Sequence, residues 1–418
     1  MSRGRSERRR PRARSNQGRS LVGQEYEVEV GPVAHGGHCV ARHDGRVLFV
    51  RHALPGETVV ARVTDGGEKS RFLRADAVRV VTPSAHRVDD GCPFAGPGRC
   101  GGCDWQHTTA AHQRELKTAV VREQLRRLAG YEWTGEVEPL LGDDDGAGWR
   151  TRVEFSLTRD RRLGLLAHRS HDVVAVDPCR IADPRIAEVG LYDERFEAGV
   201  TSVDVTTTSR GEVIAVELPL RDDEVEPIVV EDVTAARETH SFRVNARGFW
   251  QVHPGAAPTF VTHVLAELAA QPGEHVLDLY CGVGLFAGFL ADAVGAEHVI
   301  GIEGDEAAVD HARDNVPGAT FIAGDVTEQL RYLDAPTDLV VLDPPRTGAG
   351  REVIEQILQR GPRAVAYVAC DPAALGRDVG YAAEFGYQVR SVRGFDAFPM
   401  THHVECVALL TKTGSDLH

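Results

Sequence analysis

Residues 275–284, His-Val-Leu-Asp-Leu-Tyr-Cys-Gly-Val-Gly, open the most regular part of this chain and indicate its architecture. An apolar run leads into two glycines and then into a helical pattern that continues to about Val294. The glycines let a ligand approach the backbone, although the third glycine of the dinucleotide fingerprint is not at its required place. Glu303 ends the next apolar run, where an acidic side chain can bind ribose hydroxyls. The stretch therefore predicts a nucleoside cofactor at a strand end.

Strands alternate with helices from this stretch to the C-terminus. Short apolar runs predict strands at 299–303, 319–322, 338–342 and 364–370, and two closing strands near 389–392 and 404–410. This alternation is typical of a doubly wound, Rossmann-like α/β sheet. Ligands of such sheets bind at the carboxyl ends of the parallel strands.

Two of these strand ends carry side chains that could do chemistry. Asp343 begins the sequence Asp-Pro-Pro-Arg, whose prolines favour a rigid loop, although loops of this kind also serve as ordinary turns. Cys370 ends the run that starts at Ala364. A free cysteine is often only a small buried hydrophobe, so position alone leaves the role of Cys370 open.

The other cysteines include a cluster with metal-ligand spacing. Cys92, Cys100 and Cys103 are separated by seven and then two residues in a Gly- and Pro-rich loop. A tetrahedral zinc site or an iron-sulfur cluster needs a fourth soft ligand, and Cys179 is the candidate. The spacing does not choose iron over zinc. Cys281 belongs to the glycine loop, and no partner is evident for the two remaining cysteines.

The N-terminal part of the chain reads differently. Residues 21–81 contain short runs with period-two alternation and Gly-rich turns, which predict a small all-β barrel of the oligonucleotide-binding size. Barrels of this kind also serve as plain structural modules. Residues 1–20 hold eight Arg and one Glu and so have a net charge of +7, whereas the whole chain has a net charge of −15. Such a tail should be disordered, and it either binds a polyanion such as RNA or is simply solvated.

Length and composition limit the class of protein. The 418 residues suggest about three domains. No apolar run approaches the roughly 18 residues of a membrane-spanning helix, and no secretory segment is evident. We therefore expect a cytoplasmic protein without membrane association, and a monomer by default.

Five motifs, taken together, resemble the class I RNA uracil-5-methyltransferases. They are Phe-Trp-Gln-Val-His at 249–253, Asp-Leu-Tyr-Cys-Gly at 278–282, Asp-Pro-Pro-Arg at 343–346, Tyr-Val-Ala-Cys-Asp-Pro at 367–372 and Phe-Pro-Met-Thr-His-His-Val-Glu at 398–405. The resemblance extends upstream, where the barrel is similar to a TRAM domain. It implies a multidomain α/β protein with a disordered Arg-rich tail at 1–20, a TRAM barrel at 21–82, a β-rich middle domain with an iron-sulfur loop at 83–242 and a methyltransferase domain at 243–418.

The resemblance also implies roles for single residues. Cys370 would be the nucleophile and Glu405 the base. S-adenosyl-L-methionine would be held by Gln251, Tyr280, Glu303, Asp325 and Asp343, and a 4Fe-4S cluster, rather than zinc, by Cys92, Cys100, Cys103 and Cys179. The substrate would be a uridine in RNA, with 23S ribosomal RNA favoured and transfer RNA the alternative.

Two further functions fit some of the same features. Asp-Pro-Pro at a strand end also suits methylation of a base nitrogen, a reaction that needs no cysteine. A non-catalytic RNA-binding protein could keep the same cofactor fold. The first alternative predicts that methyl transfer is retained when Cys370 is replaced by Ala, and the second predicts no methyl transfer to any RNA.

Overall fold

The structure, a computed structural model, describes residues 18–142, 145–221 and 224–414. The chain divides into two compact units, Met1–Ala34 with His38–Arg87 and His35–Gly37 with Val88–His418. The Arg-rich tail predicted at residues 1–20 lies, up to residue 17, outside the described residues. Within the described parts of the chain, no helix has the length and apolar composition that crossing a membrane would require.

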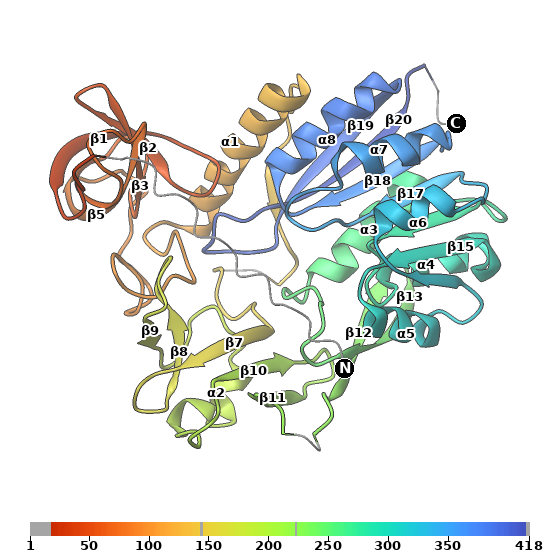
Figure 1. The fold of residues 1–418 in the computed structure, drawn as a ribbon, viewed down its shortest axis with the longest axis horizontal. Helices are drawn as coiled ribbons and strands as arrows, with labels where there is room; N and C mark the ends of the chain where they lie inside the picture. The colour runs from red at the N-terminus through yellow and green to blue at the C-terminus, as the bar shows by residue number, and fades with distance from the viewer. Residues whose placement is uncertain (1–17, 143–144, 222–223, 415–418) are drawn as a thin grey trace, which may run out of the picture. The chain divides into compact units, whose positions relative to one another are not determined.

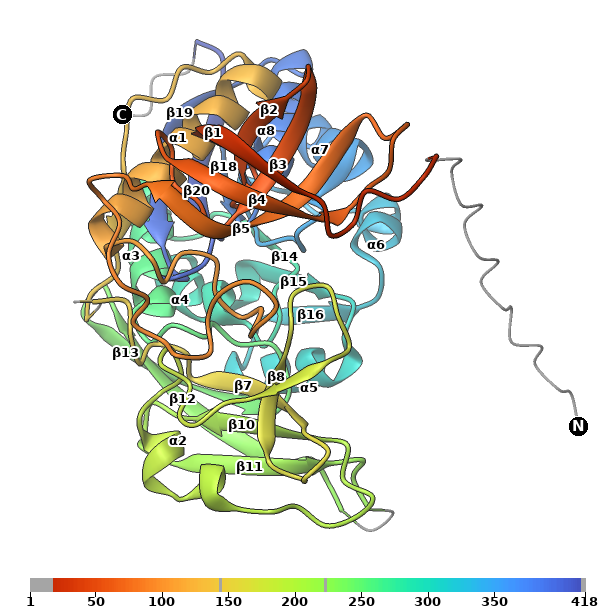
Figure 2. The same ribbon diagram turned by 90° about the vertical axis from the view of Figure 1, so that its left-hand side faces the viewer.

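The first unit is a closed five-stranded barrel with the strand order β1-β2-β3-β5-β4 (Figure 2). Alternate residues such as Val28 and Val30, or Cys39 and Ala41, are buried, as the period-two pattern requires. The predicted barrel is confirmed. Its strands are Glu25–Val33 (β1), Cys39–His43 (β2), Arg46–Arg51 (β3), Thr58–Asp65 (β4) and Phe72–Thr82 (β5).

The second unit is built on an eight-stranded sheet with the order β16-β15-β14-β17-β18-β20-β19-β6 (Figure 1). β14 to β18 are parallel, and β20 runs antiparallel to both β18 and β19. The predicted doubly wound sheet is confirmed. Its strands are Val137–Pro139 (β6), Val276–Leu279 (β14), Val299–Glu303 (β15), Thr320–Ala323 (β16), Leu339–Leu342 (β17), Ala364–Ala369 (β18), Tyr387–Asp396 (β19) and Glu405–Lys412 (β20).

Helices cover both faces of this sheet, so its central strands are buried on both sides. In β18, Ala364, Ala366 and Val368 belong to one core, and the residues between them belong to the other. A strand buried on both faces has a continuous apolar sequence, which is why 364–369 shows no polar alternation. One core includes Ala256–Leu268 (α3), Leu285–Val294 (α4) and Glu306–Asn315 (α5); the other includes Ala110–Ala129 (α1), Val326–Tyr332 (α6), Gly350–Gln359 (α7) and Pro372–Glu384 (α8).

The edge of the sheet contains a strand from far upstream. β6 pairs in parallel with β19, and α1, which precedes β6, packs against α8. Residues 110–139 thus belong structurally with the C-terminal sheet. The link matters for the site because α1 contacts the loop between β19 and β20.

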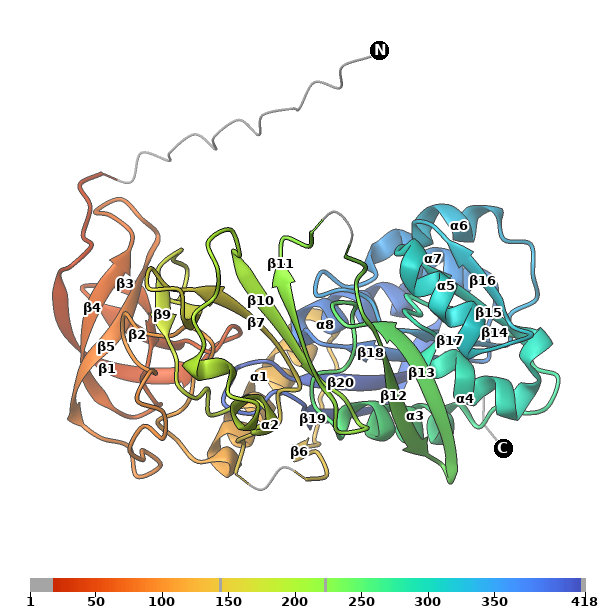
Figure 3. The same ribbon diagram turned by 90° about the horizontal axis from the view of Figure 1, so that it is seen from below.

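The remainder of the second unit is antiparallel β-structure (Figure 3). A five-stranded sheet has the order β11-β10-β7-β8-β9, and the hairpin β12-β13 packs against α3, α4 and α5. Phe155 and Val203 are fully buried in the core of the five-stranded sheet, with the short helix Arg185–Glu188 (α2) beside them. The strands are Arg152–Leu157 (β7), Leu163–Leu166 (β8), Val173–Ala175 (β9), Ser202–Thr207 (β10), Val213–Leu218 (β11), Ile228–Ala235 (β12) and Glu238–Asn245 (β13).

Candidate active site and cysteine site

A cavity of about 610 Å³ lies at the carboxyl ends of β14, β15, β17 and β18. This is the crevice position expected for an open α/β sheet, and the volume is in the range of small-molecule sites. The cavity contains every residue predicted for catalysis or cofactor binding. They are Gln251, Tyr280, Glu303, Asp325, Asp343, Cys370 and Glu405.

The glycine loop after β14 leaves room for a ligand. Tyr280 has a φ of +60° and Gly282 a φ of +53°, so the backbone turns sharply as it leaves the strand. A Cβ atom added at Gly282 would meet nothing within 4 Å. The backbone here is therefore open to a molecule in the cavity.

Glu303 is oriented by this loop. Its Oε2 accepts a hydrogen bond from the Gly282 N–H at 3.0 Å, and its Oε1 accepts one from the Asp305 N–H at 3.0 Å. A carboxylate fixed in this way can still accept further hydrogen bonds from hydroxyl groups, because each oxygen has two lone pairs. Asp325 is the N-cap of α6, since its Oδ1 accepts from the Glu328 N–H at 3.0 Å.

Asp278 supports the loop from below and was not predicted as a site residue. It is fully buried, and its Oδ2 accepts a hydrogen bond from the Ala287 N–H in α4 at 2.9 Å. Burial raises the pKa of Asp278 to about 8. Its position in Asp-Leu-Tyr-Cys-Gly marks it only as a strand residue, so no local pattern indicates its hydrogen bond to α4.

The register of two strands brings Cys370 and Glu405 together. In the antiparallel pair of β18 and β20, Ala369 lies opposite Cys406. The next position in the same register places Cys370 opposite Glu405, and directly opposite residues of a sheet have Cβ atoms about 4.5–5.5 Å apart. Both side chains line the cavity. The thiol and the carboxyl group can therefore act on the same bound molecule.

The backbone on both sides of Cys370 is firmly held. Asp371 caps α8, with its Oδ1 accepting hydrogen bonds from the Ala373 and Ala374 N–H groups at 3.0 and 2.8 Å. Pro372 occupies the first turn of α8, where its missing N–H costs nothing. Cys370 is thus fixed at the junction between a buried strand and a capped helix.

Burial and nearby acidic groups disfavour the ionised forms of both side chains. Burial, with the carboxyl groups of Glu405 and Asp343 nearby, raises the pKa of the Cys370 thiol to about 12. Burial and Asp343 also raise the pKa of Glu405 well above its ordinary value. Arg346 acts in the opposite direction on both groups, because its positive charge favours their ionised forms. It is the cation that can stabilise a thiolate at this position.

His403 is a second cavity residue that was not predicted. Burial lowers the pKa of His403 to about 3, and the neighbouring His402 adds to the effect, so the ring is neutral. It precedes Glu405 by two residues and lines the same cavity. Residues two apart along extended backbone face the same side, and this periodicity could have identified His403 from the motif.

The loop of residues 397–404, between β19 and β20, carries His403 and leads into Glu405. It is anchored at its start by Lys117 of α1, whose Nζ lies 2.5 Å from Asp396 Oδ1 and 3.0 Å from the Phe398 carbonyl oxygen. The side chains of Lys117 and Asp396 are completely buried. Gln113, one turn earlier on α1, accepts a hydrogen bond from the Met400 N–H at 2.8 Å. α1 therefore fixes the loop that precedes the candidate base.

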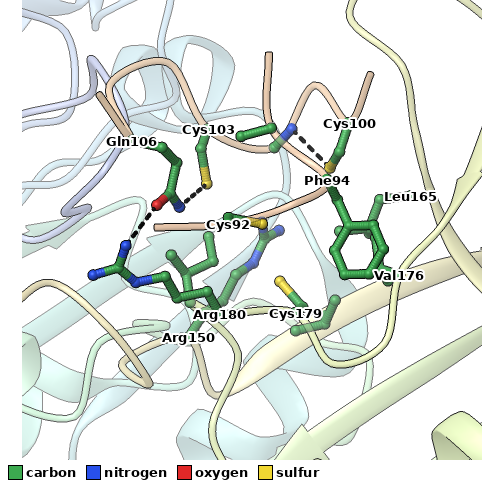
Figure 4. A pocket seen from close by; sticks show the side chains of 14 residues that line it. Cys92, Phe94, Cys100, Cys103, Gln106, Arg150, Leu165, Val176, Cys179 and Arg180 are labelled. Atoms are coloured by element: carbon green, nitrogen blue, oxygen red, sulfur yellow. Dashed lines mark hydrogen bonds between the residues drawn. The ribbon is translucent and has the colours of Figure 1, made fainter. Parts of the chain in front are cut away.

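The four clustered cysteines form a separate site (Figure 4). Cys92, Cys100 and Cys103 lie on the loop before α1, Cys179 follows β9, and all four line one pocket. Figure 4 shows the sulfur atoms of Cys92, Cys103 and Cys179 directed into a common space, with Arg150 and Arg180 beside them. The structure thus brings together the four residues that the spacing predicted as ligands.

Hydrogen-bond donors and cations surround these sulfur atoms. Gly102 N–H lies 3.4 Å from Cys100 Sγ, and Gln106 Nε2 lies 3.3 Å from Cys103 Sγ. Burial raises the pKa of Cys103 to about 12, so the buried thiolate form needs a positive partner. Four thiols in one pocket are the donor set of a cysteine-bound metal group, which would supply that positive charge.

Comparison with known proteins gives matches along nearly the whole chain. The TRAM domain family matches residues 19–78, and a methyltransferase domain family matches residues 276–372. An uncharacterized RNA methyltransferase of Streptomyces avermitilis is 49% identical, over 95% of this chain and 100% of the relative. The 23S rRNA (uracil(1939)-C(5))-methyltransferase RlmD of Shewanella sp. is 32% identical, over 95% of this chain and 98% of the relative.

One solved structure matches the fold over most of the chain. It is the tRNA (uracil-54, C5)-methyltransferase of Pyrococcus abyssi in complex with S-adenosyl-L-homocysteine, with a TM-score of 0.68 and 22% identity. The match covers 92% of this chain and 100% of that chain. At this identity the match shows that the two chains share a fold.

Proposed function

The chain belongs to the S-adenosylmethionine-dependent RNA (uracil-5-)-methyltransferase family, and we propose that it methylates carbon 5 of one uridine in 23S ribosomal RNA through a covalent adduct on Cys370. The observation that carries the proposal is the placement of Cys370 opposite Glu405 in the cavity that also contains the predicted cofactor residues. A thiol and a carboxyl group, facing each other beside a cofactor site, are the two groups that this reaction needs.

Cys370 is the nucleophile of the proposed mechanism. Carbon 5 of uracil is a poor nucleophile until a thiolate adds to carbon 6 and the carbon 5–carbon 6 π electrons move into an enolate. The thiol first gives its proton to solvent water, and the positive charge of Arg346 favours the resulting thiolate. Because burial raises the pKa of Cys370 to about 12, the thiolate depends on such a nearby positive charge.

Glu405 is the base that completes the reaction. Bound S-adenosylmethionine would supply an electrophilic methyl group to carbon 5 of the activated uracil and would leave as S-adenosylhomocysteine. Carbon 5 then carries both the methyl group and its original hydrogen. Glu405 takes that proton, the electrons re-form the double bond, and the sulfur–carbon 6 bond breaks to release Cys370. Glu405 must be ionised for this step, and Arg346 favours that form.

The cofactor residues fit a nucleoside with a sulfonium side chain. The open backbone at Gly282 admits the ligand, and the oriented carboxylate of Glu303 can accept hydrogen bonds from ribose hydroxyls. We assign the remaining contacts to Gln251, Tyr280, Asp325 and Asp343, which line the same cavity. The carboxyl groups among them favour a positively charged ligand such as a sulfonium.

RNA must present the target base in a particular way. Carbon 6 of a stacked and paired uracil cannot reach a thiol at the bottom of a cavity, so the uridine is flipped out or lies in a loop. The TRAM barrel is a second surface that we propose contacts RNA. The name of the 32% identical relative favours 23S ribosomal RNA as the substrate. Loss of one 5-methyluridine from that RNA in cells that lack this chain tests the proposal.

We further propose that Cys92, Cys100, Cys103 and Cys179 hold a 4Fe-4S cluster. Among the described residues, these cysteines do not form a group of three or more whose sulfur atoms all lie within 4.8 Å of one another. One zinc ion with bonds of about 2.3 Å would hold its four sulfur ligands roughly 3.8 Å apart. In any three of these cysteines at least one sulfur–sulfur distance therefore exceeds 4.8 Å, which suits a group larger than one zinc ion. A cluster of this kind would join the two loops, and its iron atoms would be bound by the four thiolates.

Purification without air tests this assignment. We expect a brown protein that absorbs at about 400 nm and contains about four iron atoms per chain. Replacing Cys179 by Ser should remove most of the iron, because Cys179 is the ligand from the second loop. The same change at Cys406, which is fully buried outside this pocket, is the matched control and should leave the iron in place. Stoichiometric zinc without iron would refute the cluster.

A further inference from the structure

The loop that carries Cys92, Cys100 and Cys103 is joined by hydrogen bonds to the loop of residues 397–404, which leads into Glu405. Asp104, next to Cys103, and Trp105 donate their N–H groups to the Met400 carbonyl oxygen at 2.9 and 3.1 Å. Asp104 Oδ2 accepts from the His402 N–H at 3.1 Å and lies 2.6 Å from His402 Nδ1. The carboxyl group of Asp104 therefore holds both the backbone and the ring of His402, three residues before Glu405.

Packing reinforces the same connection. Met400 is 3% exposed and forms a small core with Trp149 and Ile181, against which Cys103 and Cys179 also pack. Met400 has a φ of +66°, a backbone conformation that non-glycine residues rarely adopt. Such a conformation persists only where the surroundings determine it. Here the surroundings are residues beside two of the cysteine ligands.

We propose that Asp104 and His402 are positioning residues that hold Glu405 in place for proton removal and connect its position to the cysteine site. The inference rests on the proposed function. Cys370 is held by other contacts, namely β18 and the cap of α8. Loss of the Asp104–His402 pair should therefore displace the base and leave the nucleophile in place.

This separation predicts a specific kinetic defect. Addition of Cys370 and methyl transfer precede the step that needs Glu405. When Glu405 is displaced, the methylated RNA stays attached to Cys370 for longer, because the carbon 5 proton is removed slowly. A general structural defect would instead lower adduct formation and turnover together.

The experiment compares Asp104→Ala, His402→Ala and Asp104→Asn in the full chain with unmodified 23S ribosomal RNA. Asp160→Ala is the control, because Asp160 is exposed at the tip of a hairpin, where its Oδ1 accepts a hydrogen bond from the Thr158 hydroxyl group. We measure kcat, KM for RNA, the fraction of protein bound covalently to RNA during turnover, and iron per chain. His402 is not adjacent to a cysteine, so its variant separates positioning from cluster assembly.

We expect kcat to fall about 10- to 100-fold in both alanine variants, with a higher adduct fraction and a KM within about twofold of the parent. Asp104→Asn keeps an oxygen that can accept a hydrogen bond from the His402 N–H, so its kcat should lie between those of the parent and of Asp104→Ala. Wild-type kinetics, or an adduct fraction that falls in step with kcat, would overturn the inference. Failure of the proposed function is distinguishable, because the unmodified enzyme itself would then form no adduct.

Discussion

Replacing Cys370 by Ala is expected to lower methyl transfer to RNA by at least about 10⁴-fold and to abolish the covalent protein–RNA adduct. The expected loss is large because carbon 5 of uracil does not attack a methyl donor until a thiolate has added to carbon 6. Removing a nucleophile that acts together with its base typically costs this much or more. The measurement is incorporation of labelled methyl groups from S-adenosylmethionine into unmodified 23S ribosomal RNA.

Cys406→Ala is the matched control for this variant. Cys406 is the next residue after Glu405, but it is fully buried in the core and does not line the cavity. Its replacement should leave turnover within a few-fold of the parent, as expected for a small change in a core. Retention of turnover in Cys370→Ala would contradict the mechanism and would favour methylation of a base nitrogen.

Replacing Glu405 by Gln is expected to reduce turnover by about 10²- to 10⁴-fold, the usual contribution of a positioned acid or base. Glutamine has a similar size but cannot accept the carbon 5 proton. The adduct should therefore accumulate, and the RNA trapped in it should already carry the methyl group. Denaturing gel electrophoresis of the reaction, with label in the methyl group, measures both quantities.

Glu138→Gln provides the control for the loss of a carboxylate. Glu138 lies on β6, pairs with Arg393 and is about half exposed, with no contact to the cavity. Turnover should change little, because exposed ion pairs contribute little. A Glu405→Gln enzyme that forms less adduct than the parent would contradict the role of Glu405 as the base.

Much of the sheet could be predicted because its strands are apolar runs that end in polar residues. The prediction for 299–303 coincides with β15, and the helical pattern that was predicted to continue to about Val294 corresponds to α4, which ends at Val294. β6 was not foreseen. It has three residues, too few for a periodic pattern, and its partner β19 lies more than 250 residues later. Its pairing is decided by tertiary contacts and not by local sequence.

The residues of the candidate site could be predicted from the sequence, but their arrangement in space could not. Motifs identified the residues that line the cavity, and cysteine spacing identified the second site. The position of Cys370 opposite Glu405 depends on the register of β18 and β20, which no local sequence pattern predicts. The bond between Asp104 and His402 joins residues 298 positions apart. Contacts between residues so far apart in the sequence depend on the assembled fold. The hydrogen bonds between the loop of Cys103 and the loop of residues 397–404 could therefore be found only in the structure.

The electrostatics of the site could also not be read from the sequence. A cysteine nucleophile is usually described with a lowered pKa, whereas burial raises the pKa of Cys370 to about 12. The sequence offers Arg346 as a compensating cation, but burial and the nearby acids depend on packing. Burial and these acids therefore disfavour the thiolate form that the proposed mechanism needs, and Arg346 favours it.

The central claim is that this enzyme makes 5-methyluridine in 23S ribosomal RNA with Cys370, and the most direct test is to map that nucleoside in cells. Ribosomal and transfer RNA from cells that lack this chain would be compared with RNA from cells complemented with the unmodified or the Cys370→Ala enzyme. We predict that one 5-methyluridine disappears from 23S ribosomal RNA and returns only with the unmodified enzyme. An unchanged set of 5-methyluridines, or a loss confined to transfer RNA or to a base methylated on nitrogen, would contradict the account.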